Sequence, residues 1–391
     1  MEKKKYLNIV RLSSFLQHFL MAYFIKMVVV YLLKNDVTPW IAVSIPVVLE
    51  FSRMISRAFK KIVAFSIKAD YRKIHIFHFV SFTLLIVLIS QCRSVYTIYL
   101  FTILAGFITG VRACSATRLI TSNQEYESYG FIEDERASVI GLTLGYILSQ
   151  SIYDFSPLIY ILGYVVIGVI SIILCLCIKD VPKNDVMEPL NDYNTLTKTQ
   201  KNNALIVTIL FGILAGLWCI SLSALEELAP LITNKVAYLT SIFTIVEFIF
   251  LLIISGKLLD KIKKKQRLLL VETIIALVDC TSLLISSLLL SWKGLIISFA
   301  LSGIFATLGD PIWGSIISSY SLNNRTIYAY VNKIYFITRA IFSVLAWIVC
   351  RECVINGIES FKYLAITLLT LIIITYLIAN KINKKIFNRT I

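Results

Sequence analysis

The chain has 391 residues, 58% of them are hydrophobic, and the mean hydropathy is +0.81. A soluble protein of this length has too little interior to bury so much apolar surface, which excludes a soluble globular fold. The formal net charge is +15, but the basic residues lie mainly in short turns, where the Lys and Arg excess on one side of a membrane accounts for them. We therefore expect a lipid bilayer as a partner, and no nucleic acid.

The apolar runs are about 20 residues long, which is the length of a membrane-spanning helix and not the roughly 10 residues of a barrel strand. Only helices and closed barrels satisfy their own backbone in lipid. The sequence therefore predicts an all-α membrane protein with twelve transmembrane helices. They fall near residues 7–33, 38–66, 74–91, 96–120, 137–153, 157–178, 204–225, 236–256, 268–290, 294–318, 327–350 and 360–380.

The longest polar stretch, residues 179–203, follows the sixth run and is too short for a domain. We interpret it as a cytoplasmic linker between an N-terminal six-helix bundle, residues 1–178, and a C-terminal six-helix bundle, residues 204–391. The turn at 257–267, on the same side as the linker, holds as many Lys and Arg residues as the six opposite turns together. Because basic turns stay in the cytoplasm, both termini are expected there.

The turn after the eighth run carries one acid, Asp260, among lysines that follow Gly256. A partial copy, with Asp70 and basic residues after it, lies 190 residues upstream. Arg136 opens the fifth run and Arg325 opens the eleventh, 189 residues later. Two pairs of landmarks with nearly the same offset predict an internal duplication, which is how many transporters build a site between two halves.

Twelve spans, a linker after the sixth, and Gly-x-Leu-x-Asp with basic residues between spans eight and nine resemble the major facilitator superfamily. The resemblance covers the whole chain in topology. Its specific part is one signature, matched here by Gly256, Leu258, Asp260, Lys261, Lys264 and Lys265. Lys263 replaces the usual second Gly, and Ser66 replaces the first Gly of the upstream copy. The resemblance implies two six-helix halves that rock about a central site.

The resemblance also implies a conformational latch. A carboxylate near a helix N-terminus is favoured by the helix dipole, and it pairs with an Arg of a neighbouring helix in one state only. We predict the pairs Asp70 with Arg136 and Asp260 with Arg325. The whole predicted latch comprises Asp70, Arg72, Arg136, Gly256, Asp260, Lys261 and Arg325. The alternative is that these charges anchor helix ends among the lipid headgroups.

Charged residues inside a span are costly and rarely face lipid. In the second run, Glu50, Arg53, Arg57 and Lys61 recur at spacings of three and four and so share one helix face. One interpretation is a Glu50–Arg53 pair with snorkelling by the two cations nearer the cytoplasm. The other is that this face lines a water-filled cavity.

Arg112 in the fourth span and Asp310 in the tenth each lie about 15 residues, or roughly 22 Å of helix, from the outer end. In the superfamily, spans one, four, seven and ten line the central cavity, so the resemblance implies that these two residues face each other there. Gly309 and Pro311 flank the acid and would loosen the local helix. We predict that Asp310 binds a proton or a substrate cation, and that Arg112 binds substrate or a counter-charge.

Gln17, His18 and Lys26 interrupt the first apolar run. An ordinary His titrates near pH 6.5, so His18 suits a proton carrier, and a hydrogen-bonded packing residue is the alternative. His75 and His78 lie near the cytoplasmic start of the third span and are expected at the membrane interface.

Trp218 and Trp313 fall on the cavity-lining spans seven and ten, where they suit ligand stacking or simple packing. Glu272 and Asp279 fall on span nine, which is peripheral in the superfamily, so a structural role is expected for both. Gly141 and its neighbours allow close helix contact, but the Gly-Pro pair of many drug–proton antiporters is missing.

The sequence contains no P-loop, dense acid cluster, nucleophile elbow or HExxH motif. We therefore expect no enzyme activity, no cofactor and no bound metal. The leading hypothesis is a bacterial inner-membrane secondary transporter, acting as a monomer, that exports a small organic and preferably anionic solute against proton entry. Import of such a solute is one alternative. The alternative of a different class is a membrane sensor or immunity protein that binds a ligand without moving it.

Overall fold

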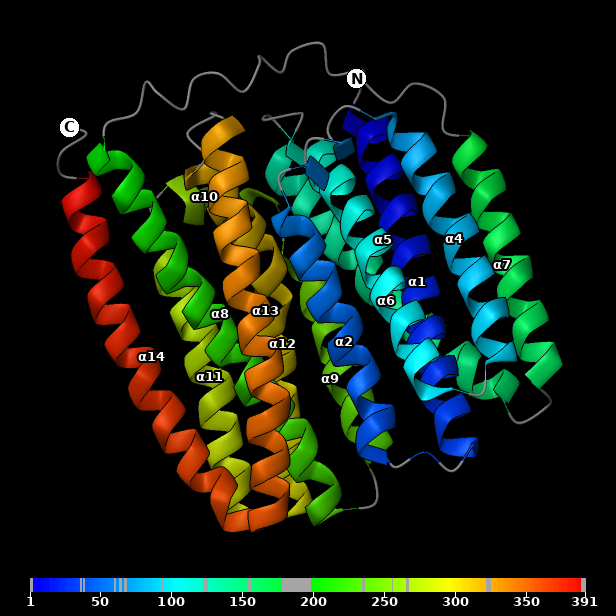
Figure 1. Ribbon diagram of the computed structural model, residues 1–391. Coiled ribbons are helices and arrows are strands. Elements are labelled where there is room, and N and C mark those ends of the chain that lie inside the picture. Colours follow the sequence, from blue (N-terminus) through cyan, green and yellow to red (C-terminus); the bar gives the residue numbers. More distant parts are fainter. Residues whose placement is uncertain are drawn as a thin grey trace. The chain divides into compact units, whose positions relative to one another are not determined.

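The computed structural model describes residues 3–35, 37, 39–59, 61–62, 65–66, 69–92, 94–121, 126–153, 157–177, 198–233, 236–254, 256–264, 267–320 and 325–387. The chain divides into two compact units, Met1–Val186 and Met187–Ile391 (Figure 1). Most of the predicted linker, residues 179–203, lies outside the described residues, so its structure stays a prediction.

Long helices build the first unit: α1 (Lys3–Lys34), α2 (Pro39–Ala58), α4 (Tyr71–Gln91), α5 (Val95–Thr121), α6 (Glu127–Tyr153) and α7 (Pro157–Cys177). Pro39 and Pro157 occupy the first helical position, where the missing proline N–H is not needed. Asp70 caps α4, because its carboxylate accepts a hydrogen bond from the Arg72 backbone N–H at 2.8 Å. Local chemistry thus sets these helix starts.

The second unit contains α8 (Lys198–Ile232), α9 (Val236–Ile253), α10 (Gly256–Lys264), α11 (Leu268–Leu289), α12 (Trp292–Tyr320), α13 (Arg325–Asn356) and α14 (Ile358–Phe387). The basic stretch expected as a turn is largely the short helix α10, which buries Leu259 and exposes Lys257. Gly357 separates α13 from α14 with a φ of +86°, a conformation that glycine adopts without strain.

Both units pair their long helices in the same way. In the first unit, α1 packs most extensively against α6, α2 against α5, and α4 against α7. In the second, α8 packs against α13, α9 against α12, and α11 against α14, although α11 packs equally closely against α12. Each unit therefore pairs its first long helix with its fifth, its second with its fourth and its third with its sixth. This correspondence supports the predicted duplication and gives two pseudo-symmetric bundles.

The register of the duplication differs from the sequence prediction. α4 begins at Tyr71 and α11 at Leu268, so these equivalent helices start 197 residues apart, whereas Asp70 and Asp260 are 190 apart. Asp70 caps α4, but the corresponding cap of α11 is Arg267, and Asp260 lies inside α10. The two acids are therefore not at equivalent positions of the fold.

Glycines allow the tightest helix pairs to approach. A Cβ added at Gly141 of α6 would lie 2.5 Å from the Phe15 carbonyl oxygen of α1, and one at Gly145 would lie 2.5 Å from that of Phe19. On α8, a Cβ added at Gly216 would lie 2.2 Å from an aromatic carbon of α13. Any side chain at these positions would push the paired helices apart, as expected for small residues at helix contacts in membranes.

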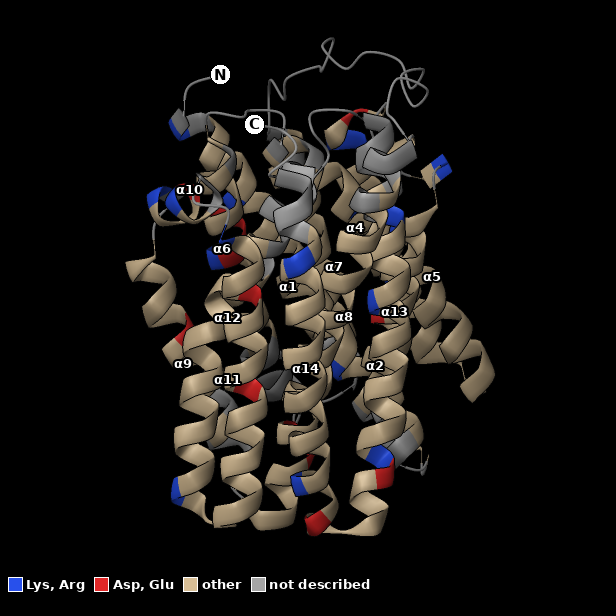
Figure 2. Ribbon diagram, turned by 90° about the vertical axis from the view of Figure 1, so that its left-hand side faces the viewer, with Lys and Arg blue, Asp and Glu red and all other residues tan. Residues whose placement is uncertain are grey.

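Eight helices among the described residues contain an apolar stretch long enough to cross a membrane. α2 is not one of them, since Glu50, Arg53 and Arg57 interrupt it; the number of twelve spans stays a prediction. Large apolar side chains such as Phe77 and Leu84 point outward from α4, which suits lipid contact. Figure 2 shows helices that are mostly uncharged along their length, and the chain is a multi-pass membrane protein.

Candidate functional site

Arg112 on α5 is fully buried, with 0% of its surface exposed. Its Nε–H donates to Nδ1 of His75 on α4 at 3.0 Å. Its Nη2 group donates to the carbonyl oxygen of Ser13 on α1 and, at 2.7 Å, to Ser13 Oγ. A buried guanidinium is costly unless it is hydrogen-bonded. One side chain therefore fixes three helices against one another, and in this conformation it is closed to solvent.

The bond from Arg112 determines the tautomer of His75. The guanidinium has only donors, so Nδ1 of His75 must accept and carries no hydrogen. The neutral ring then holds its hydrogen on Nε2, which lacks a hydrogen-bond partner within the described ranges. The ring packs on Tyr71, with 4.0 Å between the centroids.

His78 lies one turn further along α4 and is 1% exposed. Neither of its ring nitrogens has a hydrogen-bond partner in the described part of the chain. The ring stacks on Phe82, with centroids 4.5 Å apart, so packing alone holds it. His18 on α1 and Arg112 are both close enough to act on His78 electrostatically.

These residues form the histidine–arginine cluster of the first unit: Ser13, His18, His75, His78 and Arg112. Within it, Nδ1 of His18 donates to its own helix, at 2.9 Å from the Ser14 carbonyl oxygen. Both His75 and His78 are buried on the inner stripe of α4, and their predicted place at the membrane interface stays a prediction. Elsewhere on α1, Gln17 is buried and Lys26 is partly exposed.

The charges of α2 are partly paired. Arg53 Nη2 and Glu50 Oε1 lie 2.5 Å apart, which confirms the predicted ion pair. The snorkelling of Arg57 stays a prediction. Arg57 is buried and donates from Nη2 to Oγ1 of Thr117 on α5 at 3.3 Å. Lys61 is exposed.

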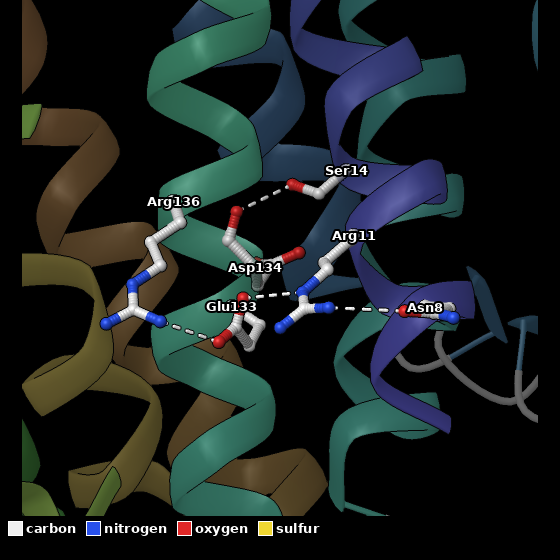
Figure 3. Close-up of polar contacts among 6 residues, drawn as sticks. All are labelled: Asn8, Arg11, Ser14, Glu133, Asp134 and Arg136. Atoms are coloured by element: carbon white, nitrogen blue, oxygen red, sulfur yellow. Dashed lines mark hydrogen bonds and ion pairs between the residues drawn. The ribbon is translucent and has the colours of Figure 1, made fainter. Parts of the chain in front are cut away.

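A second polar network joins α1 to α6 (Figure 3). Glu133 accepts from Arg11 Nε at 2.6 Å and from Arg136 Nη1 at 2.7 Å. Arg11 also donates to Oδ1 of Asn8, and Ser14 Oγ donates to the Asp134 carbonyl oxygen at 3.0 Å. The carboxylate of Glu133 thus bridges cations from two helices.

The predicted latch residues of the first unit have other contacts in this conformation. Arg136 binds Glu133, while Asp70 caps α4 through the Arg72 backbone. The Asp70–Arg136 pair stays a prediction for a different conformational state. Sequence reasoning missed Glu133, although its position three residues before Arg136 could have indicated an ion pair on one helix face.

In the second unit, Gly256, Asp260 and Lys261 all belong to α10, and Lys261 is exposed. The side chain of Arg325, at the start of α13, lies outside the described residues. The Asp260–Arg325 pair therefore stays a prediction.

Trp218 on α8 packs against α12, where a Cβ added at Gly309 would lie 3.3 Å from Cη2 of the indole ring. The side chains of the neighbouring Asp310 and Trp313 lie outside the described residues, so their roles stay predictions. The indole of Trp218 also lies beside the carboxyl of Asp279 on α11. Trp218 therefore links a buried acid to the segment that precedes Asp310.

The helix α8 carries two further acidic residues, Glu226 and Glu227. Glu226 is exposed and Glu227 is partly buried, within a helix whose apolar stretch continues to Ile232. Sequence reasoning missed them because it ended the seventh run at residue 225. Among the described residues, no three His, Cys, Asp or Glu side chains are grouped so as to hold a metal ion.

The sequence matches no protein-family model and no curated protein. The fold, in contrast, matches solved structures over almost the whole chain. The human organic anion transporter MFSD10 (TETRAN) is 12% identical, with a TM-score of 0.71, over 97% of this chain and 100% of that one. A POT family transporter in complex with 5-aminolevulinic acid is 12% identical, with a TM-score of 0.67, over 96% of both chains.

A bacterial homologue of the iron transporter ferroportin, in its outward-facing state, is 11% identical, with a TM-score of 0.68, over 97% of this chain and 99% of that one. These proteins differ in the solutes named for them but share one architecture of paired helical bundles. The likeness agrees with the helix pairing described above. The chain has the fold of the major facilitator superfamily.

Proposed function

We propose that the chain is a secondary transporter that moves a small organic solute across the cytoplasmic membrane by alternating access. The observation that carries this proposal is the match of the whole chain, with both units, to the fold of solute carriers. The structural neighbours are named for an organic anion, 5-aminolevulinic acid and iron as solutes. A carrier function is what these proteins have in common.

A negatively charged solute is the proposed class. The predicted pathway carries more cations than acids: Lys26, Arg53, Arg57 and Arg112 against Glu50 and Asp310. In a low-dielectric interior, unbalanced positive charge favours an anion. The Glu50–Arg53 pair reduces this excess but does not remove it.

Proton coupling is proposed because the first unit buries two imidazoles that could exchange a proton, those of His75 and His78. The proposed direction is efflux against proton entry. Import of the same class of solute is the alternative, and the assay below separates the two.

The purified full chain would be reconstituted in vesicles loaded with a pH-sensitive dye. Labelled benzoate and salicylate would serve as anionic probes, and tetraphenylphosphonium as a cationic one, with the movement of each across protein-free vesicles subtracted. Counterflow of a labelled anion against its unlabelled form detects carrier exchange without any gradient. An imposed pH gradient of either sign then identifies the coupled direction.

We expect counterflow of at least one anion and none of the cation. Accumulation on the acidic side indicates exchange with protons, and accumulation on the alkaline side indicates symport. If Glu50→Gln and Asp310→Asn both keep full pH-driven movement, neither acid is the proton site. Saturable binding of an anion with no flux would favour a sensor over a transporter.

A further inference from the structure

The second unit holds a buried carboxyl that the proposed solute pathway does not use. Asp279 on α11 has 1% of its surface exposed, and both of its carboxylate oxygens lack a hydrogen-bond partner among the described residues. Ser302 Oγ of α12 and Trp218 Nε1 of α8 are close enough to act on the carboxyl. Neither reaches hydrogen-bond geometry, and both also lack a partner in the described ranges. Polar groups from α8, α11 and α12 therefore lie close together in the interior without hydrogen-bond partners among the described residues.

Several buried serines lie between α11 and α12, on the C-terminal side of Asp279. Ser282 and Ser286 follow Asp279 by three and seven residues and so share its helix face. Ser286 Oγ–H donates to Ser298 Oγ at 2.8 Å, and Ser298 Oγ–H donates to the Ser282 carbonyl oxygen at 2.9 Å. All of these serines, with Ser302, are fully buried. These two bonds join Ser298 of α12 to Ser282 and Ser286 of α11.

The helices around α11 carry several charged groups. Cys280, the next residue, is electrostatically coupled to Asp279. The charged groups on the helices packed against α11 include Glu226 and Glu227 on α8, Lys293 and Asp310 on α12, and Glu359, Lys362 and Lys381 on α14. Among the described residues, the side chains of Ser302 and Trp218 lie close enough to Asp279 to act on its carboxyl.

Burial without a cation makes the ionised form of a carboxyl costly, and a bound proton removes that cost. A metal cation would need several oxygen ligands around it. The Trp218 N–H beside Asp279 is a donor, which opposes a cation and suits a carboxylate. The donor therefore disfavours a metal ion, whereas the burial of Asp279 favours the protonated carboxyl.

We propose that Asp279 is a proton-binding site and that Trp218 transmits its protonation to α12. In the ionised state, the carboxylate attracts the indole N–H and the Ser302 hydroxyl. When a proton binds one oxygen, the negative charge is lost and the indole is released. Because Trp218 also packs on Gly309, this change reaches the helix segment that bears Asp310. The inference rests on the proposed function only in naming this proton as the coupling ion.

The test is a pH titration of the purified full chain in lipid nanodiscs, followed by infrared difference spectroscopy of protonated carboxyl groups. Wild type, Asp279→Asn, Asp279→Glu and Glu359→Gln would be compared. Glu359 is an exposed acid at the start of α14 and serves as the matched control. Tryptophan fluorescence of wild type and Trp218→Phe, recorded in the same titration, reports on the indole.

We expect wild type and Glu359→Gln to share a titrating carboxyl band that Asp279→Asn lacks and Asp279→Glu moves in frequency. The pH-dependent fluorescence change should vanish in Asp279→Asn and in Trp218→Phe. An unchanged band in folded, monodisperse Asp279→Asn would overturn the proposal. So would a titration that moves when sodium replaces choline, because the bound ion would then be sodium.

Anion movement in vesicles tests the proton site at Asp279 and the proposed transport function separately. If the band is lost in Asp279→Asn but no probe anion is moved even by wild type, the proton site stands and the transport proposal fails. If Asp279→Asn still couples anion movement to the pH gradient as wild type does, the coupling role of Asp279 is refuted.

Discussion

The guanidinium of Arg112 and the imidazole of His75 share one hydrogen bond of 3.0 Å in the interior of the first unit. The arginine stays charged, so the histidine must accept through an unprotonated nitrogen. Ser13 completes the coordination of the same guanidinium from α1. The residue predicted from sequence as a substrate contact is thus, in this conformation, a buried support that joins α1, α4 and α5.

Replacing Arg112 with Ala should destabilise the protein. The change removes the hydrogen bonds to Ser13 and leaves His75 Nδ1 buried without a donor, at about 1–3 kcal/mol for an unsatisfied group. Arg112→Lys should restore only part of this loss, because an ammonium lacks the planar fork of donors. Thermal unfolding in detergent measures the effect. Arg351→Ala, at an exposed arginine of α13, should change it little, and an equal loss in both variants would contradict the support role.

The two buried histidines of α4 should respond in opposite ways to the same substitution. His78→Phe removes two unsatisfied nitrogens from a site that already stacks on Phe82, so stability should rise by about 1 kcal/mol. His75→Phe leaves the Nε–H of Arg112 without its acceptor and should lower stability by about 1–3 kcal/mol. Denaturant unfolding of the two variants checks the sign, and a gain in both would show that the Arg112–His75 bond is unimportant.

The Glu133 network should couple α1 to α6 by a measurable amount. Arg11 is 48% exposed and Glu133 is 11% exposed, so their pair lies between a surface and a buried salt bridge. A double-mutant cycle of Arg11→Met and Glu133→Gln should give a coupling of about 1 kcal/mol that falls in high salt. The cycle of Glu133→Gln with Arg351→Met is the control. A coupling free energy near zero in both cycles would show that the Arg11–Glu133 ion pair does not stabilise the protein.

The contact of Gly141 with α1 should tolerate no side chain. A Cβ there would lie 2.5 Å from the Phe15 carbonyl oxygen, which belongs to the backbone and cannot move aside alone. Gly141→Val should therefore cost about 1–3 kcal/mol through overpacking. Gly294→Ala meets mainly the flexible Leu289 side chain and should cost less. Comparable losses in the two variants would show that backbone proximity does not decide the effect.

The long apolar runs predicted the helices well, because a continuous stretch of about 20 apolar residues has few alternatives in lipid. The sequence did not show that α10 is a helix, since its nine residues are too short and too basic for that signal. It also misaligned the two halves, because a charged landmark such as Asp260, which lies inside α10, need not keep the spacing of the long helices.

The buried polar residues were harder to predict than the helices. His75 and His78 lie on the same stripe as Phe79 and Phe82, at helical spacing, and that periodicity was the available signal. The expectation for Asp279 rested on the peripheral place of span nine and not on its immediate surroundings. The burial of Asp279 depends on how α8, α11 and α12 pack together. A single sequence does not give that packing.

The most direct test of alternating access is a distance measurement between the two units that requires no known solute. Spin labels would replace Lys73 on α4 and Lys257 on α10, two exposed positions, in a chain whose eight native cysteines have been substituted. Pulsed electron resonance in nanodiscs at acidic and alkaline pH should show two distance populations whose ratio changes with pH, and Asp279→Asn should abolish that change. One distance population, identical at both pH values, would contradict a proton-coupled carrier.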